Sequence, residues 1–136
     1  MNPILLDTHA ALWAFDGKLK PETARVVEGA ASHGELMISP ITAWEIGMLV
    51  KKRRLSLALT VEDFVRALFA LPGVILAALT PTIAVAAAAL PDEVAADPAD
   101  RFLIATAAAY GARFVTRDKR IRDYAKTTTH LRCIAC

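Results

Sequence analysis

Four acidic side chains lie either directly after a predicted strand or on the apolar face of a predicted helix. Asp7 and Asp118 each follow a short apolar run typical of a strand, and Glu45 and Asp100 lie on the apolar faces of predicted helices. A carboxylate on an apolar face must be paired, neutral or bound to a cation. Two carboxylates about 5 Å apart repel by roughly 3 kcal/mol at an effective dielectric constant near 20. If the four meet at one edge of a sheet, a divalent cation removes that penalty, and all-oxygen ligands favour Mg²⁺ or Mn²⁺ over zinc.

Each of these acids also has a simpler interpretation. Asp7 and Asp118 stand between a strand and a helix, where Asp is a favoured N-cap. Asp97 is best explained as a cap, and Asp100 three residues later could answer it in a capping box. Glu45 could pair with a basic residue. Taken together, two acids at strand ends and two on core-facing helix positions favour a shared site.

Basic residues flank the proposed site. Residues 113–126 hold six basic side chains against two acids, a local net charge of +4, while the whole chain carries only +2. A second basic run, residues 51–54, ends the predicted helix that carries Glu45. Basic residues at a helix C-terminus also stabilise the helix dipole, which explains any one of them equally well. Both runs lie beside proposed acid carriers, which predicts a phosphodiester polyanion held by Arg117, Lys119, Arg120, Arg122, Lys51 and Lys52.

The elements that must position these side chains form an alternating pattern. Short apolar runs between longer helical patterns are the signature of an α/β fold with a parallel sheet covered on both faces. Strands are predicted at 4–6, 36–38, 74–76, 114–115 and 131–134, and helices at 8–15, 22–31, 41–53, 61–71, 81–89, 98–110 and 119–124. Ligands of such sheets bind beyond the C-terminal strand ends, where strand order reverses. Asp7 and Asp118 stand where that rule places a site.

Length and composition define the class of protein. A chain of 136 residues with 55% hydrophobic and 22% charged residues is typical of one globular domain, here spanning 1–136, rather than a disordered chain. The apolar stretch 74–90 is interrupted by Thr80-Pro81-Thr82, so no membrane span is expected. Two cysteines, Cys133 and Cys136, support neither a disulfide framework nor a four-ligand zinc site, and a cytoplasmic location is expected.

Four segments of the chain resemble the acidic motifs of a known enzyme family. They are LLDTHAALW at 5–13, SPITAWEIGML at 39–49, DPADRFLIATA at 97–107 and FVTRD at 114–118. In this order and spacing they resemble PIN-domain ribonucleases, specifically the VapC-like toxins of bacterial toxin-antitoxin pairs. Ala99 stands where that family often has an aromatic residue, and the Cys-Ile-Ala-Cys ending is not one of its features.

The resemblance implies a fold, an activity and partners. It implies a single PIN-like domain with a five-stranded parallel sheet sandwiched between helices. It implies a ribonuclease using Mg²⁺ or Mn²⁺ bound by Asp7, Glu45, Asp100 and Asp118, with Thr116 supporting the fourth acid and Asp97 assisting. The expected partners are RNA and a VapB-like antitoxin. Family members dimerise, and apolar surface on the predicted helix 61–71 also suggests a homodimer.

Two other function classes compete with this hypothesis. A phosphatase of the haloacid dehalogenase type would need a second Asp two residues after Asp7, and that position is His9. A non-catalytic PIN-like module that binds RNA or protein would not need all four acids. His9 and His33 are interpreted as ordinary surface or helix residues, and Trp13 and Trp44, at helical spacing with aliphatic residues, are predicted in the core.

Overall fold

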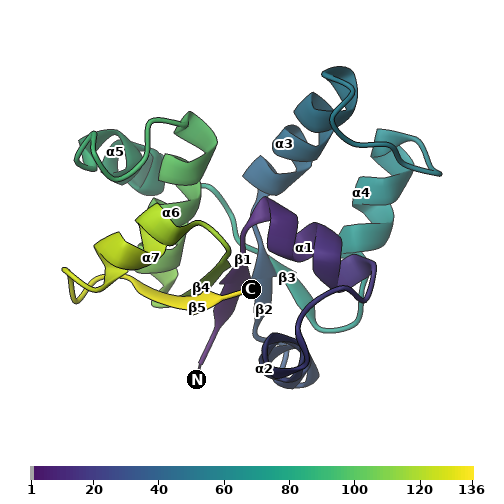
Figure 1. Ribbon diagram of the computed structural model, residues 1–136, viewed down its shortest axis with the longest axis horizontal. Helices are drawn as coiled ribbons and strands as arrows, with labels where there is room; N and C mark the ends of the chain where they lie inside the picture. The colour runs from purple at the N-terminus through teal and green to yellow at the C-terminus, as the bar shows by residue number, and fades with distance from the viewer. Residues whose placement is uncertain (1) are drawn as a thin grey trace.

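A five-stranded parallel sheet forms the centre of the protein, as a computed structural model describes it for residues 2–136 (Figure 1). The strands lie in the order β3-β2-β1-β4-β5, and all four neighbouring pairs are parallel. Their bounds are β1 Ile4–Leu6, β2 Leu36–Ile38, β3 Val74–Leu76, β4 Arg113–Thr116 and β5 Arg132–Ala135. The chain builds one half of the sheet from β1 outward and then crosses to the other side of β1. Strand order therefore reverses at β1.

Seven helices cover this sheet and extend the core beyond it. Their bounds are α1 Thr8–Phe15, α2 Pro21–Ser32, α3 Pro40–Lys51, α4 Val61–Phe69, α5 Pro81–Ala89, α6 Pro98–Tyr110 and α7 Lys119–Ala125. In Figure 1, α1, α3 and α4 form one half of the molecule and α5, α6 and α7 the other, with β1 between them. The predicted elements are confirmed in type and order, with boundaries shifted by one or two residues.

Alternating side chains of the strands feed two hydrophobic cores. Ile4 and Leu6 pack with the buried residues of α1, α2 and α4 on one face. Leu5 lies on the opposite face with buried residues of α6 and α7. Because successive strand residues point to opposite faces, both faces of β1 are apolar and fully covered. The central strand is thereby a rigid base for the residue that follows it, Asp7.

Two predictions about apolar surface are wrong. The side chain of Trp44 is 56% exposed, and Trp13 is only half-buried. The helix predicted at 61–71 ends at Phe69 and buries Phe64 and Leu68 in the core, so it does not leave its apolar face uncovered. The large exposed apolar residues lie elsewhere: Trp44, Leu59, Ile75, Leu76, Val85 and Tyr110. Among residues 2–136, no helix has both the length and the apolar character needed to cross a membrane.

Candidate active site

The strand ends position two of the four predicted acids. Asp7 follows β1, and its N–H donates to the carbonyl oxygen of Val115 in β4 at 3.0 Å. Asp118 follows β4, which pairs with β1 on the side opposite to β2. The crevice beyond the carboxyl ends of such strands is the usual ligand site of an open α/β sheet. Both acids therefore lie at the edge predicted from sequence.

Both strand-end acids also cap helices, as the simpler interpretation predicted. The Asp7 Oδ1 atom accepts from the Ala10 N–H at 2.6 Å, and the Asp118 Oδ1 atom accepts from the Arg120 N–H at 2.9 Å. In each residue the cap occupies one carboxylate oxygen, which leaves the other oxygen able to bind a ligand. Capping and ligand binding are thus compatible at both positions, and the cap fixes the side chain's direction.

The other two predicted acids approach from helices. Glu45 of α3 accepts a hydrogen bond from the Thr8 hydroxyl, whose oxygen lies 3.3 Å from that of Thr42. Within residues 2–136 Glu45 forms no ion pair, so the suggestion that a basic residue neutralises it is wrong. Asp100 lies in the first turn of α6, and Asp97 caps that helix by accepting from the Ala99 N–H at 2.8 Å. The described residues show no bond from the Asp97 N–H to Asp100, so the capping box is incomplete.

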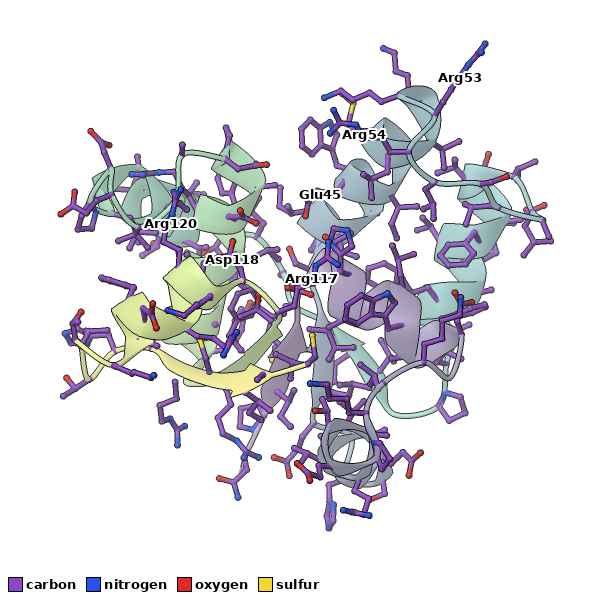
Figure 2. The ribbon with its side chains drawn as sticks, in the orientation of Figure 1. Glu45, Arg53, Arg54, Arg117, Asp118 and Arg120 are labelled. Carbon is purple, nitrogen blue, oxygen red and sulfur yellow. The ribbon has the colours of Figure 1, made fainter. Side chains whose placement is uncertain are left out.

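These acids line one pocket of about 330 Å³. Its lining residues are Asp7, Thr8, His9, Glu45, Asp97, Asp100, Thr116, Arg117 and Asp118. All six acid and threonine positions predicted for the site are among them. Figure 2 shows Glu45, Arg117 and Asp118 lying around one opening between the two halves of the molecule. Across residues 2–136, however, no three His, Cys, Asp or Glu side chains are gathered closely enough to hold a metal ion as they stand. We refer to this cavity as the acid pocket.

Burial raises the pKa of three acids of this pocket, and for two of them nearby carboxylates raise it further. The pKa of Asp100 is raised to about 7, first by burial and then by the charges of Asp97, Glu45, Asp118 and Asp7. Burial also raises the pKa of Glu45, against a hydrogen bond from Thr8. The pKa of Asp7 is raised by burial as well, although hydrogen bonds from Thr116 and Ala10 oppose the shift. Perturbed carboxyls clustered in a cleft are typical of functional sites.

Thr116 connects the two strand-end acids. It is buried at the end of β4, and its hydroxyl oxygen accepts from the Asp118 N–H at 3.1 Å. Its hydroxyl also lowers the pKa of Asp7 through a hydrogen bond. One side chain therefore orients the loop that carries Asp118 and stabilises the charge of Asp7. Thr116 therefore lies beside the fourth acid, and its supporting role stays a prediction.

Sequence reasoning missed the aromatic and imidazole wall of the pocket. His9 lines the pocket two residues after Asp7, and its ring meets Trp13 edge-on with the centroids 6.4 Å apart. The guanidinium of Arg117 lies 5.2 Å from the Trp13 ring centroid. Burial, followed by the charge of Arg117, lowers the pKa of His9. The signal was available, because His9 and Trp13 are four residues apart on the helix that Asp7 caps.

The basic segment after β4 divides into residues with different surroundings. Arg117 lines the acid pocket, whereas Lys119 is engaged by Asp123 at 2.8 Å on the exposed face of α7. Arg120 lines a separate pocket with Val94 and Tyr124. Arg122 lies against β5, and its Nη2 donates to the Arg117 carbonyl at 3.5 Å. Only Arg117 of the four therefore borders the acids.

The basic run at the end of α3 divides in the same way. Lys52 lines a groove that shares Glu45 and Asp97 with the acid pocket. Lys51 is exposed and is not among the residues that line this groove. The structure therefore brings Lys52 to the acids and leaves Lys51 apart.

The cysteines at the C-terminal end have the character of inert core thiols. Cys133 and Cys136 are free and half-buried. Burial raises the pKa of each thiol to about 11. Because the thiolate is the nucleophile and metal ligand, neither residue is activated for redox chemistry.

The fold and the site together define a PIN domain. The family model for the PIN domain matches residues 4–127, and the chain belongs to this family. Its five-stranded parallel sheet between helices agrees with the fold that the resemblance implied. The resemblance to VapC-like members of the family is confirmed by two kinds of relative.

A curated relative and several solved structures resemble the chain over almost its full length. The chain is 35% identical over 126 residues to "Ribonuclease VapC22" of Mycobacterium tuberculosis (strain ATCC 25618 / H37Rv). The alignment covers 91% of this chain and 93% of that protein. A DNA-bound VapBC structure from Salmonella typhimurium aligns with a TM-score of 0.65 at 19% identity, covering 99% of this chain and 98% of the other. VapBC2 from Rickettsia felis, bound to a promoter DNA fragment, gives 0.64 at 15% identity over 97% of each chain.

Proposed function

We propose that this protein is a divalent-metal-dependent endoribonuclease and the toxin of a VapBC-type toxin-antitoxin pair. One observation carries the proposal: Asp7, Glu45, Asp100 and Asp118, from four separate segments, line one pocket of a PIN domain. The relative named Ribonuclease VapC22 supports the choice of RNA as the substrate. Action on RNA would place the activity in the cytoplasm.

The donor set of the acid pocket fits a hard divalent cation. Its candidate ligands are carboxylate oxygens, which suit Mg²⁺ or Mn²⁺. In Asp7 and Asp118 the Oδ1 atom caps a helix, and the second carboxylate oxygen takes no part in the cap. The raised pKa values of Asp7, Glu45 and Asp100 show that the protein alone does not neutralise the cluster. When bound, such a cation would activate water and stabilise charge on the phosphoryl group.

The remaining residues of the pocket have supporting roles in this proposal. Arg117 presents a cation beside the acids, and its contact with Trp13 holds the guanidinium at the rim, where it would contact a substrate phosphate. Thr8 and Thr116 orient Glu45 and the two strand-end acids through hydrogen bonds. In the hydrolysis, the water oxygen bonds to phosphorus, the bond to the 3′ oxygen breaks, and the product carries a 5′ phosphate.

The proposed partners are an antitoxin and a second copy of the chain. The solved VapBC complexes that share this fold support a VapB-like antitoxin. A homodimer remains our prediction, although the apolar face of α4, which was expected to form its surface, packs into the core. The exposed apolar residues Ile75 and Leu76 of the edge strand β3 are the candidate surface instead. Light scattering should show twice the chain mass of 14.6 kDa, and a strictly monomeric species would contradict this prediction.

The activity is tested by cleavage of single-stranded RNA with and without divalent ions. Wild-type protein should cut RNA in Mg²⁺ or Mn²⁺ and stop when a chelator is added. Asp7→Asn should lower cleavage by more than about 100-fold, beyond the loss typical of residues that only orient metal ligands. Asn caps a helix as well as Asp does, so the variant keeps the N-terminus of α1.

The matched control is Asp16→Asn, which makes the same change at the exposed C-cap of the same helix. It should cleave RNA as the wild type does. If the wild type binds RNA, cuts none with either ion, and is unaffected by Asp7→Asn, the protein is a non-catalytic RNA-binding module.

A further inference from the structure

A groove of about 480 Å³ runs beside the acid pocket. It is lined by Trp44, Glu45, Met48, Leu49, Lys52, Arg54, Ala96, Asp97 and Pro98. Glu45 and Asp97 also line the acid pocket, so the two cavities are continuous. The volume lies within the roughly 300–1,000 Å³ of typical small-ligand sites. We call this cavity the Trp44 groove.

One wall of the Trp44 groove is a row of side chains along α3 and its C-cap residue. Trp44, Met48 and Lys52 are spaced four residues apart, which places them above one another on one helix face. The indole of Trp44 is 56% exposed, while its neighbour Ile46 is fully buried. A large aromatic ring left open to solvent on a groove wall is a surface on which a flat apolar group can stack.

The end of α3 directs a second cation toward this groove. Arg53 has a left-handed backbone conformation with φ of 58°, and the Arg54 N–H donates to the Leu49 carbonyl at 2.8 Å. This is a Schellman-type helix end with Arg in the position that usually holds Gly. In Figure 2, Arg53 points away from the molecule, whereas Arg54 lies on the same side of α3 as Glu45. The strained turn therefore separates two adjacent arginines.

The two cations of the groove have no acidic partner. Within residues 2–136 neither Lys52 nor Arg54 takes part in an ion pair, although both are exposed. Unpaired cations beside an exposed aromatic ring combine the two features that bind single-stranded nucleic acids: stacking for the base and positive charge for the phosphate. A hydrophobic peptide would use the ring but would gain nothing from the two cations.

We propose that the Trp44 groove binds one nucleotide of the RNA next to the phosphodiester that is cut. The base stacks on Trp44, Lys52 and Arg54 contact its phosphate, and the strand continues past Glu45 and Asp97 into the acid pocket. This inference rests on the proposed ribonuclease function and adds a specificity-determining site to it. Because the stacked base must be out of a duplex, the groove selects single-stranded or looped RNA.

The direct test is the fluorescence of Trp44 in full-length protein made inactive by Asp7→Asn. The chain has two tryptophans, so Trp13→Phe in this background leaves Trp44 as the sole indole. A ten-nucleotide oligoadenylate should quench its emission in a saturable manner. Inorganic polyphosphate, which has charge but no bases, should bind without comparable quenching.

Variants divide the groove into its two parts. Trp44→Ala should lower affinity for a labelled oligoadenylate by about 5- to 150-fold, the range for loss of one base–aromatic stack, and Trp44→Phe should recover most of it. Arg54→Gln should weaken binding and lower the salt dependence by about one phosphate contact. Arg53→Gln makes the same charge change one residue away and should bind as the parent does.

The outcomes separate this proposal from the ribonuclease activity. If the wild type cleaves RNA but Trp44→Ala and Arg54→Gln bind and cleave equally well, the nucleotide site is wrong and the ribonuclease stands. If Trp44→Ala weakens only the antitoxin complex, the groove is a protein-binding surface and the proposal is overturned. If no RNA is cut but oligoadenylate still quenches Trp44, the nucleotide site stands and catalysis does not.

Discussion

Two adjacent charged residues of α6 have opposite surroundings. Arg101 of α6 is 15% exposed, and its guanidinium donates to backbone carbonyls of Ala87 at 3.1 Å, Ala88 at 3.1 Å and Ala95 at 3.0 Å. Asp100, one residue earlier, faces the acid pocket, and no hydrogen bond to its carboxylate is found among the described residues. One charge is fully engaged by the protein, and the other is surrounded by like charges.

The difference separates a charge that the protein satisfies itself from a charge that it leaves without a partner among the described residues. Arg101 binds carbonyls in the last turn of α5, of which Ala87 also accepts from the Leu90 N–H at 3.4 Å, and thereby fixes the segment that leads to Asp97. Asp100 lies in the first turn of α6, where a negative charge favours the helix dipole, but burial and neighbouring carboxylates raise its pKa, which is a cost to the folded protein. Such a cost is explained when a ligand outside the chain completes the site. The comparison predicts opposite responses to substitution.

The largest effect on stability should come from Arg101. Replacing Arg101 by Lys keeps the charge but removes most of the donors that satisfy the carbonyls around residues 87–95, and we expect a loss of about 3 kcal/mol. Denaturant unfolding measures it. Arg25→Lys, at an exposed position of α2, is the matched control and should change little. A loss below about 1 kcal/mol for Arg101→Lys would show that the anchor is not what holds this segment.

A smaller effect of opposite sign should come from Asp100. Its pKa is about 7 in the folded protein and near 3.8 when exposed, so the unfolded chain loses this proton at lower pH than the folded one. The stability of the metal-free protein must then fall as the pH rises from about 4 to about 7. Asp100→Asn should weaken that dependence, to which Glu45 and Asp7 also contribute, and stabilise the metal-free protein at pH 8 by about 1–2 kcal/mol, allowing for solvent screening.

Asp123, on the exposed face of α7, should show a smaller effect with the opposite pH trend to that of Asp100. Hydrogen bonding to Lys119 lowers the pKa of Asp123, so its contribution is present at neutral pH and is lost as the pH falls through that lowered pKa. Asp123→Asn should therefore destabilise slightly, with a pH trend opposite to that of Asp100. If both substitutions changed stability in the same direction, the distinction between the two kinds of carboxyl would be wrong.

The sequence was sufficient for the strands, the helices and the placement of the acids. Asp7 and Asp118 were predictable because a parallel sheet places the residues after its strands at one edge. The strand order β3-β2-β1-β4-β5 was not predicted, since short apolar runs do not specify their neighbours. The acids predicted on α3 and α6 lie where helical periodicity places them.

Other features depended on tertiary packing that periodicity cannot supply. Helical spacing put Trp44 on an apolar stripe, but its side chain is 56% exposed in the folded protein. A count of basic residues could not distinguish Arg117 at the pocket from Lys119 in a surface ion pair. Arg101 looked like any surface arginine, because its partners are carbonyl groups as far as 14 residues away.

The central claim is that the acid pocket needs a cation, and thermal unfolding during Mn²⁺ titration tests it most directly. Binding to the folded state alone should add about 2.7 kcal/mol at a hundredfold excess over the dissociation constant. We expect the melting temperature of the wild type to rise with Mn²⁺ and that of Asp7→Asn to rise far less, although this variant should start higher in metal-free buffer. Melting that millimolar Mn²⁺ leaves unchanged, or raises equally in both proteins, would contradict the account.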